Sequence, residues 1–89
     1  MERDALVARL KARGVRSVRD PARHPTYLVY GPNPNEEGTF LVYEVDDDPT
    51  PRGVFQVLGV TRTPNGGEPE DFPKDPAVLR RLLKVYGLE

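Results

Sequence analysis

Two stretches decide the fold of this chain: Thr39–Val45 (TFLVYEV) and Val54–Thr61 (VFQVLGVT). Both are rich in β-branched and aromatic residues, and turn residues such as Pro, Gly, Asn or Asp bound each of them. This pattern predicts two β-strands that follow one another as an antiparallel hairpin. Because the two strands carry much of the apolar bulk, we expect the rest of the chain to fold around them.

Both faces of this predicted hairpin are apolar, since alternate residues of a strand point to opposite faces. In the first strand, Leu41, Tyr43 and Val45 are expected to point one way, and Phe40 and Val42 the other. In the second strand, Val54, Leu58 and Val60 are expected to point one way, and Phe55 and Val57 the other. Leaving one face exposed to water would lose about 25 cal/mol of stabilisation for each Å² of apolar surface. Three arrangements would cover the second face: a helix on each face, the long loop containing Phe72, or a second subunit. We favour both helices on one face and self-association through the other.

An amphipathic pattern predicts a helix over residues 2–13. Gly14 supplies the left-handed residue that ends many helices, and Val15 stands where the chain would fold back on the last turn. The apolar stripe that this helix would bury consists of Leu6, Val7 and Leu10.

A second helix is predicted near the C-terminus. Asp75 is a typical N-cap, and Pro76 fits the first helical position because its missing N–H has no partner there. Gly87 is expected to end this helix, with Leu88 folding back on it. The stripe at helical spacing is Leu79, Leu82, Leu83 and Tyr86.

The remaining segments complete a single α+β domain over residues 1–89. Val15–Arg19 is a candidate edge strand, and Thr26–Tyr30 is predicted as a further strand. Gly31–Gly38 is predicted to be a loop without regular structure. Arg62–Lys74 is a long connection that Phe72 should pin to the body. The fold class is therefore a three- or four-stranded antiparallel sheet with an N-terminal and a C-terminal helix packed on it.

The composition excludes several classes of protein. There is no cysteine, so disulfides and thiolate metal sites are excluded. No apolar run is long enough to span a membrane, and Met1–Asp4 leads into an amphipathic stretch rather than a signal peptide, so we expect a cytoplasmic protein. Arginine outnumbers lysine ten to three, and there are ten prolines. This bias favours a high-GC or thermophilic bacterial source.

The formal net charge of −1 hides an uneven distribution. Residues 1–25 carry +4, residues 26–76 carry −7, and residues 77–89 carry +2. Ion pairing between the basic ends and the acidic middle is the simpler interpretation. Two oppositely charged surfaces for two partners are the alternative.

Few residues are candidates for catalysis or metal binding. His24 is the only histidine and a candidate general acid or base, but Ser17, the only serine, lies in no nucleophile elbow. A turn histidine is therefore favoured. Asp46–Asp48 and the acidic residues of 68–71 do not fit a calcium loop, which needs ligands at alternate positions and a glycine at the sixth; the sixth residue from Asp46 is Pro51. We expect no metal and no cofactor.

The basic N-terminal segment suggests nucleic-acid binding. Arg16, Arg19 and Arg23 would contact phosphates, and Tyr27 and Tyr30 would stack on bases, with Tyr43 or Phe40 as further stacking residues. The sequence pI of about 5.8 argues against this function, because nucleic-acid-binding domains are usually strongly basic.

The order of an N-terminal helix ending in glycine, three strands and a C-terminal helix resembles that of the HicA toxins. The matching pieces are Leu6–Val15, His24 ahead of the Thr26–Tyr30 strand, and Leu79–Leu88. The resemblance implies a dsRNA-binding-like fold and ribonuclease activity. Two features depart from that family: Ala22-Arg23-His24 replaces its Gly-Ser-His approach, and the middle of this chain is acidic where the family's is basic.

The function expected from these observations is that of a non-catalytic protein-binding or regulatory accessory module that self-associates through a sheet face. The alternative is an RNA-binding or RNA-cleaving protein that uses His24 and the basic termini. A third interpretation is that the acidic loops mimic nucleic acid for a basic protein partner.

Overall fold

The computed structural model describes residues 2–19, 23–48, 50, 56–64 and 70–88. Its elements follow in the order α1 (Glu2–Ala12), β1 (Arg16–Ser17), β2 (Tyr27–Pro32), β3 (Phe40–Val45), β4 (Gln56–Thr61) and α2 (Pro76–Val85). The four strands form one antiparallel sheet in the order β1-β2-β3-β4. The predicted α+β class, with a helix near each terminus, is confirmed.

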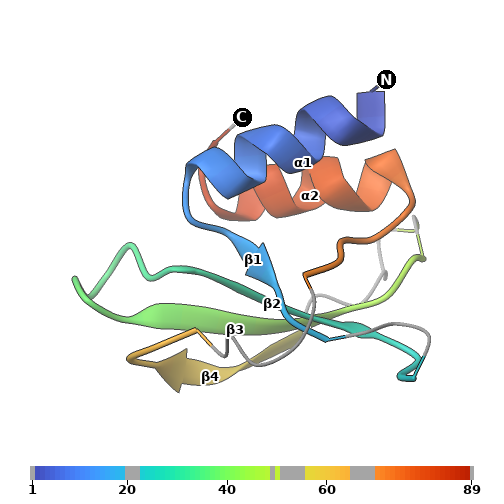
Figure 1. Ribbon diagram of the computed structural model, residues 1–89. Coiled ribbons are helices and arrows are strands. Elements are labelled where there is room, and N and C mark those ends of the chain that lie inside the picture. Colours follow the sequence, from blue (N-terminus) through green and yellow to red (C-terminus); the bar gives the residue numbers. More distant parts are fainter. Residues whose placement is uncertain (1, 20–22, 49, 51–55, 65–69, 89) are drawn as a thin grey trace.

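Both helices lie on the same face of the sheet (Figure 1). They run side by side in the same direction, and Arg80 of α2 forms an ion pair with Glu2 of α1. The sequence analysis favoured both helices on one face over one helix on each face. The structure shows that they share one, which makes the molecule a two-layer sandwich of helices on a sheet.

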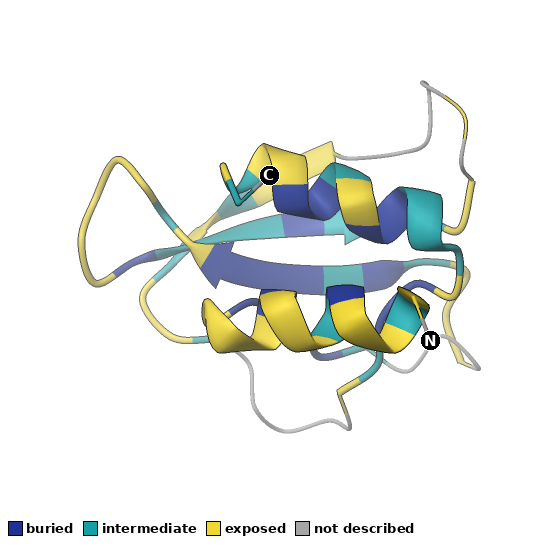
Figure 2. Ribbon diagram, turned by 90° about the horizontal axis from the view of Figure 1, so that it is seen from above, coloured by how far each residue is buried: buried dark blue, intermediate teal, exposed yellow. Residues whose placement is uncertain are grey.

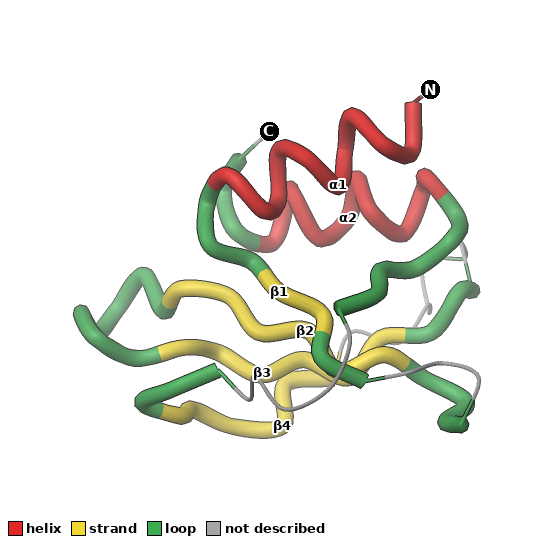
Figure 3. Tube along the Cα trace, in the orientation of Figure 1, coloured by secondary structure: helices red, strands yellow, loops and turns green. Residues whose placement is uncertain are grey.

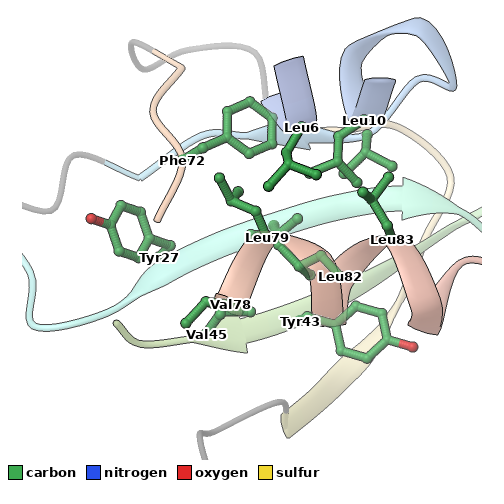
Figure 4. Close-up of a cluster of buried hydrophobic side chains, with 12 residues drawn as sticks. Leu6, Leu10, Tyr27, Tyr43, Val45, Phe72, Val78, Leu79, Leu82 and Leu83 are labelled. Atoms are coloured by element: carbon green, nitrogen blue, oxygen red, sulfur yellow. The ribbon is translucent and has the colours of Figure 1, made fainter. Parts of the chain in front are cut away.

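The core fills the space between these two layers (Figure 4). Helix α2 contributes four buried side chains, whereas α1 contributes only Leu6 and Leu10. Phe72, in the long connection, is 2% exposed, which confirms that this residue pins the connection to the body. The core residues of α2 and the sheet are Val78, Leu79, Leu82, Leu83, Tyr27, Val29, Tyr43 and Val45.

Both helices end as the sequence predicts. Gly14 has a φ of 84°, and the Val15 N–H donates to the Leu10 carbonyl at 3.0 Å. Gly87 has a φ of 67°, and the Leu88 N–H donates to the Leu83 carbonyl at 2.8 Å. Left-handed glycines of this kind satisfy the last carbonyls of a helix and turn the chain back toward its core.

Strand β2 is longer than predicted and includes Gly31 and Pro32, which the sequence assigned to a loop without regular structure. Gly31 pairs with Leu41 of β3, and the Tyr86 ring lies directly on the Gly31 backbone. A Cβ at Gly31 would overlap that ring. The glycine therefore serves close packing within a strand rather than a turn.

A β-bulge changes the facing of β4. Tyr43 of β3 pairs with Val57, and Leu41 pairs with Val60, so the strand contains one extra residue between these pairs. Directly paired residues share a face. Val57 and Val60 therefore both point to the helix side, and the prediction that they occupy opposite faces is wrong. Val54 and Phe55, predicted as the start of this strand, lie outside the described residues.

Candidate functional site

Strand β4 presents an open edge. Within the described residues, no strand pairs with its outer side. Its six residues carry no charge and no proline, and Val57, Leu58 and Val60 are 53%, 51% and 55% exposed. Figure 2, viewed from the helix side, shows this exposed strand extending beyond α2. We call Gln56–Thr61 the open edge.

One flank of α2 adds to this surface. Arg81 donates to the backbone carbonyls of Asp48 and Thr50, which lie in the connection between β3 and β4, so the Arg81 flank of the helix faces β4. Val85 follows Arg81 by four residues and shares that flank. Its side chain is 43% exposed. Val57, Val60 and Val85 therefore lie on the helix side of the open edge, and we call them the valine shelf.

The opposite edge of the sheet is closed. Strand β1 has two residues, and on its outer side the Asp71 N–H donates to the Ser17 carbonyl at 3.3 Å. The Glu70 carboxylate accepts from the Arg16 guanidinium at 2.6 Å and lies 3.8 Å from the Lys11 ammonium. Phe72 anchors this segment in the core. The end of the long connection thus covers the β1 edge.

The sheet face away from the helices is less open than the sequence suggests. Val18 is 1% exposed and Tyr30 is 9% exposed on this face. Its other large apolar side chains, Leu28, Phe40 and Val42, are only partly exposed. Among the described residues, the strongly exposed large apolar side chains belong to β4 and to Val85. The apolar surface available to a partner is therefore the open edge rather than the whole face.

His24 lies exposed in a turn, outside any strand or helix. Within the described part of the chain, its ring has no hydrogen bond or ion pair. Ser17 is completely buried on the helix side of β1, and its hydroxyl has no hydrogen-bond partner. The structure therefore does not join these two residues into a nucleophile–base pair.

The arginines proposed to bind nucleic acid lie in different surroundings. Arg16 is paired with Glu70. The Arg19 guanidinium lies 3.7 Å from the Glu44 carboxylate and donates to the Thr26 hydroxyl at 3.0 Å. Arg23 is exposed in the same turn as His24. Carboxylates of the acidic middle thus already balance the charges of Arg16 and Arg19.

The two tyrosines of this proposed site lie on opposite faces of β2. Tyr27 is 2% exposed on the helix side, whereas Tyr30 is on the other face. The Tyr27 hydroxyl donates to the Asp47 carboxylate at 3.1 Å. Burial, together with the hydrogen bond to Asp47, raises the pKa of Tyr27 to about 12. The two rings do not form one stacking platform.

The acidic run stabilises its own loop. Asp46 accepts from the Asp48 N–H at 2.8 Å, and Asp48 accepts from the Thr50 N–H at 2.9 Å. The Asp47 carboxylate bridges Tyr27 and the Lys74 N–H, the latter at 2.8 Å. Among the described residues, no group of three or more metal-ligating side chains comes together. Glu68 lies outside the described residues.

Ion pairs connect the basic N-terminal segment to the acidic middle. Besides the pairs of Arg16 and Arg19, the Arg3 guanidinium lies 3.7 Å from Asp71 and donates to the Phe72 carbonyl at 2.9 Å. Lys11 also lies over the Phe72 ring, 5.9 Å from its centre. These contacts are the internal charge complementarity that the sequence suggested.

A shallow cleft of about 190 Å³ lies at the C-terminal ends of the helices. Tyr86 forms part of its wall and meets Tyr43 edge to face, with ring centres 5.6 Å apart. The Tyr86 hydroxyl is buried without a hydrogen-bond partner, and burial raises its pKa. The lining residues are Arg13, Val15, Pro32, Pro34, Tyr86 and Leu88. No sequence motif indicated this cleft.

Comparison with known proteins adds no functional assignment. No protein-family model matches the chain, and neither the curated proteins nor the solved structures contain a significant match. In the described part of the chain, no helix is both long enough and apolar enough to cross a membrane. The candidate site therefore depends on the geometry of this molecule alone.

The sequence analysis identified β4 as a strand but missed the shared face of Val57 and Val60. One signal was available: Gly59 stands inside the strand pattern, and an isolated glycine there often marks a bulge. Val85 was outside the predicted stripe of α2, and its position beside β4 depends on how the helix docks.

Proposed function

We propose that this protein is a non-catalytic protein-binding module of the cytosol, and that its binding element is the open edge. The observation that carries the proposal is an uncharged six-residue edge strand in which three large apolar side chains are more than half exposed. An edge strand offers unpaired N–H and C=O groups to an extended segment of a partner, and its side chains add apolar contact.

The contrast with the other edge supports this proposal. Proteins usually block edge strands with charges, prolines, very short strands or a covering segment, because open edges promote unwanted pairing. Strand β1 is short, carries an arginine and is covered by Asp71. Within the part of the chain that the structure describes, none of these features is present in β4. An edge that is left open in a small domain is best accounted for by a partner that pairs with it.

The test is a selection of linear peptides of about ten residues from a displayed library, a length that spans an edge strand. Val60→Glu places a charge in the open edge, and Ala8→Glu, on the exposed side of α1, is the matched control. We expect selected peptides to lose at least about tenfold in affinity on Val60→Glu and to be unaffected by Ala8→Glu. Peptides that bind both variants equally would contradict the proposal.

The RNA-binding alternative has less support. Arg16 and Arg19 are paired with glutamates, and Tyr27 and Tyr30 lie on opposite faces of the sheet. The alternative predicts RNA binding that weakens steeply as salt rises, because each phosphate contact releases counterions. Titration of a labelled single-stranded RNA at two salt concentrations distinguishes the two functions.

The proposal of a thermophilic source is separate from that of function. It rests on the ten prolines of the chain, which reduce the entropy of the unfolded state. We expect a melting midpoint above the mesophilic range of about 45–65 °C. Calorimetry of the wild-type protein measures it directly.

A further inference from the structure

We propose that the partner of the open edge is a second copy of this chain, which pairs antiparallel with β4 across a two-fold axis. This inference rests on the proposed function and names the occupant of the same surface. The two four-stranded sheets would become one continuous sheet. A two-fold axis perpendicular to that sheet places both helix layers on the same side.

The sequence of the open edge is nearly symmetric about its centre. Each end of the strand is an uncharged polar residue, Gln56 or Thr61. The next residue inward from either end is a valine, Val57 or Val60, and the two central residues are Leu58 and Gly59. In an antiparallel pair related by a two-fold axis, each strand meets its own sequence in reverse. With the axis between Leu58 and Gly59, Gln56 faces Thr61 of the partner subunit, and Val57 faces Val60 of the partner subunit.

The β-bulge makes this symmetric register apolar on one face. Because Val57 and Val60 both point to the helix side, the two copies bring four valines together there. Val85 of each copy stands on the flank of α2 that faces this cluster. Directly opposed β-branched residues are favourable cross-strand pairs.

The centre of the register pairs a large residue with a small one. Leu58 is 51% exposed and would face Gly59 of the partner subunit. The space that a Cβ at Gly59 would enter is open, with no atom within 4 Å. The glycine therefore leaves room for the leucine of the other copy.

Charge also favours a second copy. A charged residue within the strand would meet an apolar or like-charged residue in a symmetric pair, and β4 contains no charged residue. The net charge of −1 gives little long-range repulsion between two identical chains. Acidic or basic partners gain no attraction from the strand itself.

The size of the surface limits the affinity. Stable interfaces bury about 800 Å² on each partner, and one strand with a valine shelf falls short of that area. We therefore expect a dimer that dissociates on dilution, with a dissociation constant in the micromolar to millimolar range. Sedimentation equilibrium from about 10 μM to about 1 mM covers that range.

Paired charge variants test the register. Val57→Lys and Val60→Glu each place a charge opposite a valine, and we expect each variant alone to raise the dimer dissociation constant at least about tenfold. Mixed together, the two variants bring the lysine of one opposite the glutamate of the other. The mixture should therefore form a heterodimer that neither variant forms by itself. Ala8→Glu, on α1, should dimerise like the wild type.

Several results would overturn the inference. A wild-type protein that stays monomeric at about 1 mM would exclude the dimer. Variants that dimerise as the wild type does would place the interface elsewhere. A monomer whose β4 still captures displayed peptides, and loses them on Val60→Glu, would remove the dimer but keep the proposed function. A monomeric protein whose β4 captures no displayed peptide would contradict both the dimer and the proposed function.

A second measurement covers variants that fail to fold. Circular dichroism establishes whether each variant keeps the wild-type structure. Hydrogen exchange on the wild-type protein needs no substitution: amides of β4 should become more protected as concentration rises, whereas amides of β1 should not change. Equal protection of β4 at low and high concentration would contradict the inference.

Discussion

At the β1 edge, two strand residues are covered by a segment more than fifty positions away in sequence, and an arginine–glutamate pair lies across the junction. At the β4 edge, six residues carry no charge, and three apolar side chains are more than half exposed. The domain therefore closes one edge with its own chain, whereas no strand among the described residues pairs with the other edge. Because both edges belong to the same sheet, the effect of a substitution at one edge can be compared directly with its effect at the other.

The first prediction breaks the closed edge. Phe72 is fully packed in the core and anchors the segment that covers β1, so Phe72→Ala removes both a buried ring and the anchor. We expect it to lower the free energy of unfolding by about 3–5 kcal/mol. Urea denaturation measures the loss. Val60→Ala, on the open edge, is the control and should cost less than about 1 kcal/mol. Equal losses would mean that the two edges do not differ in this way.

The second prediction compares two strand glycines. An alanine at Gly31 meets the Tyr86 ring, whereas an alanine at Gly59 meets open space. We expect Gly31→Ala to destabilise the protein by about 1–3 kcal/mol through overpacking. Gly59→Ala should be neutral or stabilise it by up to about 1 kcal/mol, because alanine has less backbone entropy to lose. Thermal denaturation of both variants measures the difference.

A double variant checks the cause assigned to Gly31. If the Tyr86 ring is the obstacle, Tyr86→Leu should reduce the additional loss caused by Gly31→Ala, and the two effects will not add. Strictly additive losses would show that the backbone of β2, rather than the ring, resists the alanine.

Local features of this fold could be predicted from the sequence. Gly14 and Gly87 end their helices, and Asp75 caps α2, accepting from the Ala77 N–H at 2.8 Å. Each of these signals depends on a few neighbouring residues, so the chain specifies them without reference to the rest of the molecule. Two helices and three strands, with a fourth strand as a candidate, followed from the same local reasoning.

The features that position the candidate site were not predictable in the same way. The bulge depends on how β4 meets β3, and it moved Val57 to the face of Val60. The need for a glycine at position 31 comes from the ring of Tyr86, which is fifty-five positions away in sequence. The closing of β1 depends on Asp71. Each feature is set by a partner distant in sequence, which periodicity does not identify.

The third prediction concerns the pH dependence of stability at the loop that follows β3. The Asp47 carboxylate joins the Tyr27 hydroxyl to the backbone of Lys74, just before α2. Folding raises the pKa of Tyr27 from 10.0 to about 12, so the folded protein favours the neutral phenol. This contribution is complete below pH 10 and is lost as pH rises from 10 toward about 12.

Tyr27→Phe isolates this effect. It removes the hydrogen bond to Asp47 and should cost about 1 kcal/mol at neutral pH. The variant should also lose less stability than the wild type as pH rises above 10. Part of the decline should remain, because the pKa values of Tyr43 and Tyr86 are raised as well. Urea denaturation at a series of pH values compares the two proteins. An unchanged alkaline decline would remove Tyr27 as a contributor.

The smallest effect is expected from the ion pairs across the closed edge. Glu70 faces Arg16 and Lys11, but all three side chains are partly exposed, at 29%, 44% and 52%. Exposed pairs contribute about 0–1 kcal/mol. Glu70→Gln keeps the shape of the side chain and should therefore cost less than about 1 kcal/mol, and the cost should disappear in about 1 M salt, where screening is nearly complete. A much larger loss that still disappears in salt would show that charge, rather than Phe72, holds the segment against β1.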